Sequence, residues 1–146
     1  MKHLLTYIIG VGLLVTACDI ERSDNGRLDG FWQLSSVDSL STGSSTDLRE
    51  KQVTWGFQGS LLETRIANSP RDSDDVVLRF NHTGDVLRLS EPYIVNRDSG
   101  DKKVNQPAVL YQFGISRLGE SFKVLRLTND NMDLESEVLR LHFRKY

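Results

Sequence analysis

Residues 52–57 read Gln-Val-Thr-Trp-Gly-Phe, in which polar and apolar side chains alternate one by one. A period of two is typical of a β-strand with one buried face, because successive side chains of an extended chain point to opposite sides. Val53, Trp55 and Phe57 therefore share the face expected to be buried. Residues 60–66 are the predicted partner strand, and the glycine just before them suits a hairpin turn.

The same alternation recurs along the rest of the chain. Further strands are predicted over residues 31–37, 76–80, 85–89, 121–127, 132–135 and 138–144. Residues 81–84, Asn-His-Thr-Gly, are predicted to form a four-residue hairpin loop, and residues 129–131 a second turn. About eight strands joined mostly by short turns predict an all-β fold, an antiparallel up-and-down barrel whose closure removes exposed strand edges.

Two stretches interrupt this pattern. Residues 41–49 are small and polar, which predicts a loop with one helical turn near Asp47. Residues 91–107 are charged and predict a long loop, and loops of this length in compact domains are usually functional or mobile. Residues 108–115 are compatible with either a strand or a short helix.

Length and composition limit the classes of protein to which the chain can belong. Its 146 residues are 38% hydrophobic and 26% charged, with a formal net charge of -2. These values suit one domain with a single core, assigned to residues 28–146. The near-neutral charge offers no basic face for nucleic acid, so that partner is excluded. The single cysteine excludes a disulfide framework and a zinc site built from thiolates.

Residues 1–17 have the features of a secretory signal peptide. A short basic start precedes an uncharged apolar run, which is shorter than the roughly 20 residues that a membrane-spanning helix needs. The run ends in Val-Thr-Ala-Cys, which resembles the bacterial lipobox. This resemblance implies cleavage between Ala17 and Cys18 and attachment of diacylglycerol to the Cys18 sulfur, followed by acylation of the new amino group. The alternative is an ordinary buried cysteine in the first element of the fold.

Residues 18–27 are polar and form a predicted tether between the anchor and the domain. Asp19, Glu21 and Asp24 place acid just beyond the cysteine. This stretch resembles an inner-membrane retention signal of enteric bacteria and also a surface-export signal of Bacteroidota, and a plain solvated spacer is the third interpretation. The expected location is the bacterial envelope, at the outer membrane, with the cell surface as an alternative.

Three further motifs carry a family resemblance. Residues 28–34 read Leu-Asp-Gly-Phe-Trp-Gln-Leu and contain the Gly-x-Trp of the lipocalin-type first strand. Residues 80–85 read Phe-Asn-His-Thr-Gly-Asp, and residues 139–146 read Leu-Arg-Leu-His-Phe-Arg-Lys-Tyr. With the lipobox, this set looks like the short lipocalin-like lipoproteins of Bacteroidota, a family of unknown function. The resemblance implies a calycin-type barrel in the envelope and no established activity.

The lipocalin pattern also implies how the barrel is closed. Gly30 and Trp32 would lie at the barrel floor, and an arginine from a late strand would pack across the indole. Arg140 and Arg144 are the two candidates near the end of this chain. Such a cation–π contact is worth about 0.5–2 kcal/mol.

A search for catalytic and metal-binding motifs indicates no enzyme. His82, in the predicted hairpin loop, and His142, between two arginines, are too few and too far apart for a zinc site, so no metal is predicted. The sequence has no Gly-x-Ser-x-Gly and no phosphate-binding glycine loop. The acidic turn at residues 71–75 lacks the ligand spacing of a calcium loop. No cofactor is predicted.

The expected function is therefore binding. The aromatic side chains either line an apolar cup or fill a solid core, and the chain length favours the filled core. Trp55, Tyr93 and Tyr111 are the predicted surface binding patch, beside the 91–107 loop. We expect a membrane-anchored binding or accessory module for a small apolar ligand or an envelope protein. The alternatives are an interaction subunit of an outer-membrane assembly with a filled barrel, and an inhibitor of an envelope enzyme.

Overall fold

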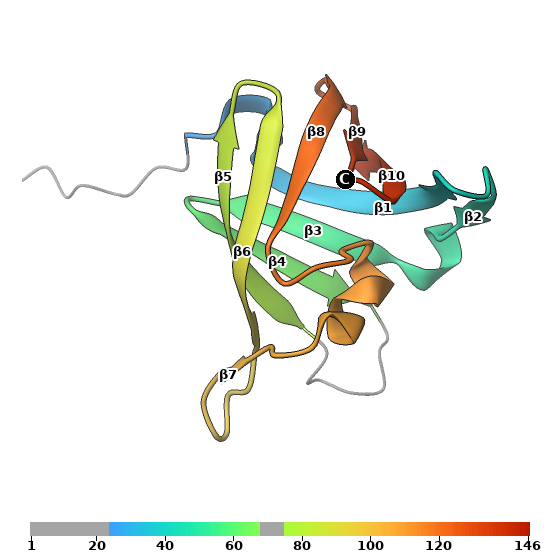
Figure 1. Cartoon of the computed structure of the whole chain (residues 1–146). Helices are drawn as coiled ribbons and strands as arrows, with labels where there is room; N and C mark the ends of the chain where they lie inside the picture. Colours follow the sequence, from blue (N-terminus) through green and yellow to red (C-terminus); the bar gives the residue numbers. More distant parts are fainter. Residues whose placement is uncertain (1–23, 68–74) are drawn as a thin grey trace, which may run out of the picture.

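The computed structural model describes residues 24–67 and 75–146, and in them the chain forms β-strands and short 3-10 helices (Figure 1). Eight strands make the main wall: β1 (Gly30–Ser39), β3 (Val53–Gln58), β4 (Leu61–Ile66), β5 (Val76–Thr83), β6 (Val86–Ile94), β8 (Glu120–Leu127), β9 (Asn131–Glu135) and β10 (Leu139–Lys145). Two short strands, β2 (Ser45–Asp47) and β7 (Lys102–Lys103), pair with β1 and β6. The helices are η1 (Gly26–Leu28), η2 (Arg49–Lys51) and η3 (Pro107–Phe113).

The eight wall strands close into an antiparallel barrel. Each pairs with the next along the wall, and β10 returns to pair with β1 from Trp32 opposite Lys145 to Ser39 opposite Leu139. No wall strand in this part of the chain is left as an open edge, which is the advantage of closure. The predicted all-β up-and-down barrel is confirmed.

The barrel has two distinct ends (Figure 1). We call the floor the end that carries η1 and the β3–β4, β5–β6 and β8–β9 turns. We call the mouth the opposite end, which carries the β1–β3 and β6–β8 connections and the β9–β10 turn. The described chain begins at the floor, and its last residue also lies there.

Several predicted boundaries are corrected. The β5–β6 hairpin turns over Gly84 and Asp85 alone, because Thr83 already pairs with Val86, so His82 lies in a strand and not in a loop. A glycine with φ of +60° at the first position suits such a two-residue turn. The predicted loop 41–49 contains β2, and the predicted loop 91–107 contains the end of β6 and β7. Of the two alternatives for residues 108–115, the helix is correct.

The floor is sealed by Trp32. Its side chain is fully buried, and its Nε1 donates a hydrogen bond of 2.9 Å to the carbonyl oxygen of Leu28 in η1. Lys145 Nζ lies 4.3 Å from the centroid of the Trp32 ring. The same ammonium donates hydrogen bonds to the carbonyl oxygens of Arg27 and Asp29. One side chain from the last strand thus holds both the indole and the backbone around η1.

The cation over Trp32 is Lys145, so the prediction of Arg140 or Arg144 was wrong. Strand alternation explains this, because the odd-numbered residues of β10 face the interior and both arginines point outward. Arg140 pairs with Glu135 at 2.6 Å, and Arg144 is exposed. Gly30 lies against the lysine, since a Cβ there would stand 3.1 Å from its Nζ.

His142 spans the seam between the first and last strands on the outer face. Its Nε2 lies 2.7 Å from Asp38 Oδ2 on β1, and its Nδ1 lies 2.8 Å from Asp133 Oδ1 on β9. A neutral imidazole carries only one N–H, so it can donate to both carboxylates only when protonated. Burial lowers the pKa of His142, but the hydrogen bonds with the two aspartates outweigh burial and leave the pKa raised.

Further charges surround this histidine. Asp133 also forms a 2.9 Å ion pair with Arg126 of β8. The ion pair of Arg140 with Glu135 lies two residues further along the same two strands, β10 and β9. The hydrogen bond with His142, and then the one with Ser45, lowers the pKa of Asp38. The seam is therefore held by a charge network that depends on protonation.

We predict that Lys145→Met lowers the free energy of unfolding by about 1–3 kcal/mol, because the cation–π contact is lost together with the hydrogen bonds to two backbone carbonyl groups. Urea unfolding followed by tryptophan fluorescence measures the change. Arg144→Met is the matched control and should have little effect, since that side chain is exposed. An equal loss in the two variants would contradict the assignment of the floor cation.

We predict that the stabilisation by His142 depends on pH. Because the pKa of His142 is raised in the folded state, its protonated side chain stabilises the fold fully below the ordinary histidine pKa of about 6.5. This stabilisation is lost as the pH rises through the folded-state pKa. The difference in unfolding free energy between the wild type and His142→Gln should be constant near pH 5–6 and should shrink at higher pH. Urea unfolding of both proteins between about pH 5 and 9 tests this. Parallel pH curves would show that the bridge does not titrate in this range.

Candidate functional site

Trp55 lies at the centre of the barrel, so the predicted surface patch of Trp55, Tyr93 and Tyr111 was wrong. Its indole is fully buried, with ring centroids 4.8 Å from Phe143 and 6.0 Å from Phe122. Such close edge contacts leave the large rings packed against each other and not around a cup. The interior of the described barrel is thus a packed core, as the sequence-based interpretation favoured.

The mouth is closed by η3 and the residues that follow it. Trp55 Nε1 donates a hydrogen bond of 3.0 Å to the carbonyl oxygen of Phe113, at the end of the helix. Leu110 and Phe113 are fully buried. Gly114 turns the chain with φ of +81°, and a Cβ there would stand 2.9 Å from Leu141 Cδ2 on β10. The helix is therefore seated in the mouth, where it closes the opening of the barrel.

The two tyrosines of the predicted patch remain on the surface but on different elements. Tyr93 lies near the end of β6, and Tyr111 lies on η3. Both are exposed. Because the tryptophan that was to join them is in the core, they do not form the predicted patch.

A cleft of about 190 Å³ opens in the barrel wall instead. β8 pairs with β6 only from Glu120 opposite Leu89 onward, so β6 has no β8 partner nearer the mouth. Residues 114–119 pass through this gap on their way from η3, and the cleft forms beside them (Figure 1 shows β8 beginning part-way along β6). Its lining comes from β6, from the start of β8 and from the β9–β10 turn: Arg88, Ser116, Arg117, Gly119, Glu120, Ser121, Glu137 and Val138.

Glu120 is the buried acid of this cleft. Its side chain is only 6% exposed, and its Oε2 accepts hydrogen bonds from the backbone N–H groups of Ser116 at 2.7 Å and Arg117 at 2.8 Å. Burial raises the pKa of Glu120 against the opposing effect of these N–H groups. Its Oε1 is buried and has no hydrogen-bond partner among the described residues, while the nearby Ser136 hydroxyl lowers the pKa of Glu120. Glu120 both fixes the loop and leaves one acceptor unmatched.

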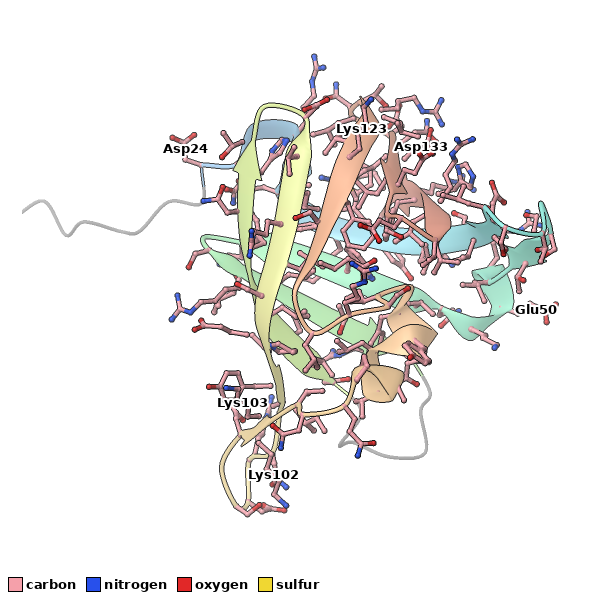
Figure 2. The ribbon with its side chains drawn as sticks, in the orientation of Figure 1. Asp24, Glu50, Lys102, Lys103, Lys123 and Asp133 are labelled. Atoms are coloured by element: carbon pink, nitrogen blue, oxygen red, sulfur yellow. The ribbon has the colours of Figure 1, made fainter. Side chains whose placement is uncertain are left out.

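The rest of the cleft carries two guanidinium groups. Arg117 Nη2 lies 2.5 Å from Glu137 Oε2, and this exposed ion pair forms one rim. The Arg88 side chain is exposed on β6 and makes no ion pair or hydrogen bond with any described residue. Figure 2 shows charged side chains at the periphery of the barrel, among them Lys102, Lys103, Lys123 and Asp133. The cleft therefore offers one buried carboxylate and one unpaired cation.

The histidines are not brought together. His142 lies in the seam network, and His82 faces inward near the floor, where its Nε2 is buried without a hydrogen-bond partner. Among residues 24–67 and 75–146, no group of three or more His, Cys, Asp or Glu side chains could hold a metal ion. In the same residues, no helix is long and apolar enough to cross a membrane. Ala17, Cys18 and the acidic turn at 71–74 lie outside the described residues.

Sequence reasoning missed Glu120 and Lys145. The inward side of β10 could have been followed one residue further, since Leu141, Phe143 and Lys145 share one alternation. Nothing in the sequence around Glu120 indicates a buried acid, because its burial depends on where the chain re-enters the wall after η3.

Comparison with known proteins gives the same fold. The family described as a lipocalin-like domain matches residues 13–146. A crystal structure of a lipocalin-like protein from Bacteroides uniformis is similar with a TM-score of 0.63 and 21% identity, over 83% of this chain and 100% of that chain. A crystal structure of an uncharacterized protein from Bacteroides eggerthii is similar with a TM-score of 0.61 and 20% identity, over 82% of this chain and 99% of that chain.

No curated protein matches the chain. The family match spans nearly the whole sequence and agrees with the closed antiparallel barrel described above. The chain therefore belongs to the lipocalin-like domain family.

Proposed function

We propose that this protein is a lipid-anchored, non-enzymatic binding module of the bacterial envelope, which binds a small polar ligand in the wall cleft and not inside the barrel. The lipocalin-like fold suggests small-ligand binding, and eight-stranded barrels of this type hold a ligand when their interior is open. Here the hydrogen bond from Trp55 to Phe113 keeps η3 in the mouth. That observation carries the proposal, because it moves the binding site to the wall.

The chemistry of the cleft supports a polar ligand. An unmatched buried acceptor favours a hydrogen-bond donor, and an unpaired guanidinium favours an anionic group. Glu120 and Arg88 supply these two features. A cavity of about 190 Å³ suits a molecule of amino-acid size that carries both groups. The carboxylates and guanidiniums bind and orient such a molecule, and the described cleft holds no nucleophile activated by a neighbouring base.

Membrane anchoring rests on the N-terminal segment. The apolar run that ends at Cys18 resembles a lipobox, and several acyl chains would fix the protein to a bilayer. The envelope location and attachment to the outer membrane are part of the same proposal.

A second candidate function is that of an interaction subunit of an outer-membrane assembly. The filled barrel favours it, because a solid core with a charged outer surface needs no small ligand. In that case the cleft would receive a polar side chain of the partner protein.

We predict that the lipoprotein purified from its host in mild detergent carries a small polar molecule, which native mass spectrometry detects as a mass increment. Glu120→Gln replaces one carboxylate oxygen with a donor and should reduce the bound fraction at least tenfold, and Arg88→Met should do the same. Lys123→Met, an exposed neighbour outside the cleft lining, is the control. A co-purified fatty acid would contradict the wall site, and a co-purified protein would favour the second function.

We predict that Cys18→Ser leaves an uncleaved and unlipidated precursor. Metabolic labelling with palmitate and fractionation of membranes test this, with Ser23→Ala in the tether as the control. A variant that fractionates and migrates like the wild type would refute the anchor.

A further inference from the structure

We propose that the floor of the barrel rests on the surface of the bilayer, through a ring of apolar side chains that surrounds it. The inference rests on the proposed lipid anchor at Cys18 and adds the orientation of the domain. The ring consists of Phe31, Leu61, Val86, Leu125 and Tyr146, whose exposed fractions are 61%, 45%, 43%, 43% and 69%.

The ring members come from different parts of the wall but from the same end. Phe31 near the start of β1 accepts a 3.1 Å backbone hydrogen bond from Tyr146, the last residue. Leu61 begins β4 directly after the β3–β4 turn, and Val86 begins β6 directly after the β5–β6 turn. Leu125 follows Val124, whose N–H donates a 2.6 Å hydrogen bond to the Asp85 carbonyl in that turn. The β5–β6 and β8–β9 turns are both at the top of Figure 1, and Asn25 Nδ2 beside η1 donates a 2.8 Å hydrogen bond to the Gly59 carbonyl oxygen in the β3–β4 turn.

The anchor arrives at this same end. The described chain begins at Asp24, and η1 then crosses the floor over residues 26–28. From Cys18 to Asp24 the chain can reach roughly 20 Å at most, at about 3.3–3.6 Å per residue. The ten residues of β1 span roughly 33 Å. A tether shorter than the strand keeps the floor, and not the mouth, near the lipid.

A lipid surface explains the ring better than a protein partner does. A planar bilayer that meets a barrel end-on contacts side chains around the whole circumference, whereas a partner protein usually covers one side. Charge does not favour the contact, since the described residues at this end include acids, such as Asp85 and Asp130, as well as bases, such as Lys123 and Arg144. The tether supplies a high effective concentration, so shallow apolar contacts suffice to orient the domain.

Fluorescence quenching in vesicles tests the orientation. Cys18 is the only cysteine and is blocked by lipid in the mature protein, so an introduced cysteine is the only free thiol. Leu61→Cys and Val86→Cys place a fluorophore at the floor ends of β4 and β6, which β5 separates, and Tyr111→Cys places it at the mouth as the control. The full lipoprotein is reconstituted in phosphatidylcholine vesicles with or without a lipid that carries a nitroxide quencher near its headgroup.

We expect quenching at least twofold stronger at positions 61 and 86 than at position 111, with no dependence on added anionic lipid. Equal quenching at all three positions, or quenching at only one of the two floor positions, would overturn the proposal. Protein that does not float with the vesicles would refute the anchor itself, which separates the two failures.

Deuterium uptake of the unlabelled lipoprotein gives an independent measurement, because residues 59–61 and 84–86 should be protected by vesicles and residues 96–101 should not. Equal protection of residues 96–101 by the vesicles would also overturn the proposed orientation.

Discussion

The hydrogen bond between the Trp55 indole and the Phe113 carbonyl is the contact on which the rest of the structure depends. It joins residues 58 positions apart and is made inside the barrel, where an unmatched indole N–H or carbonyl group would be costly. It therefore fixes η3 in the mouth and sets the Trp55 ring among the phenyl rings of the core. A barrel fold that commonly encloses a ligand is here filled by its own chain.

The same contact explains the cleft in the wall. After β6 the chain forms η3 in the mouth and only then returns to the wall. For this reason β8 begins part-way along β6, opposite Leu89. Residues 114–119 then need their backbone groups satisfied outside the ladder. Glu120 does this for two N–H groups, and the acid is buried as a result. Filling the interior and opening a polar cleft are thus two results of one path of the chain.

The barrel could be predicted from the sequence because the alternation of polar and apolar residues can be seen within each strand alone. Val53, Trp55 and Phe57 are buried as expected, and Gly-x-Trp marks the strand whose indole seals the floor. It placed Trp55 in a surface patch because periodicity gives the face of a strand but not how full the space behind it is. It chose arginines over Lys145 because the family resemblance implies an arginine, although the alternation of residues 139–145 already puts Lys145 on the face of Leu141 and Phe143. Glu120 and the aspartates around His142 meet only through pairing of distant strands, which no local pattern encodes.

The two ends of the barrel are closed by different means, and this difference suits an anchored protein. The floor is sealed by the Trp32 indole and its hydrogen bond to η1, a few residues after the predicted tether, and by the Lys145 ammonium from the last strand. The mouth is sealed by a helix from a long connection, and the cleft with the unpaired Arg88 side chain and the buried Glu120 lies in the wall nearby. In the proposed anchored protein, a short tether would keep that cleft turned away from the lipid. The proposed binding site and the proposed attachment site would then lie at different places along the barrel axis.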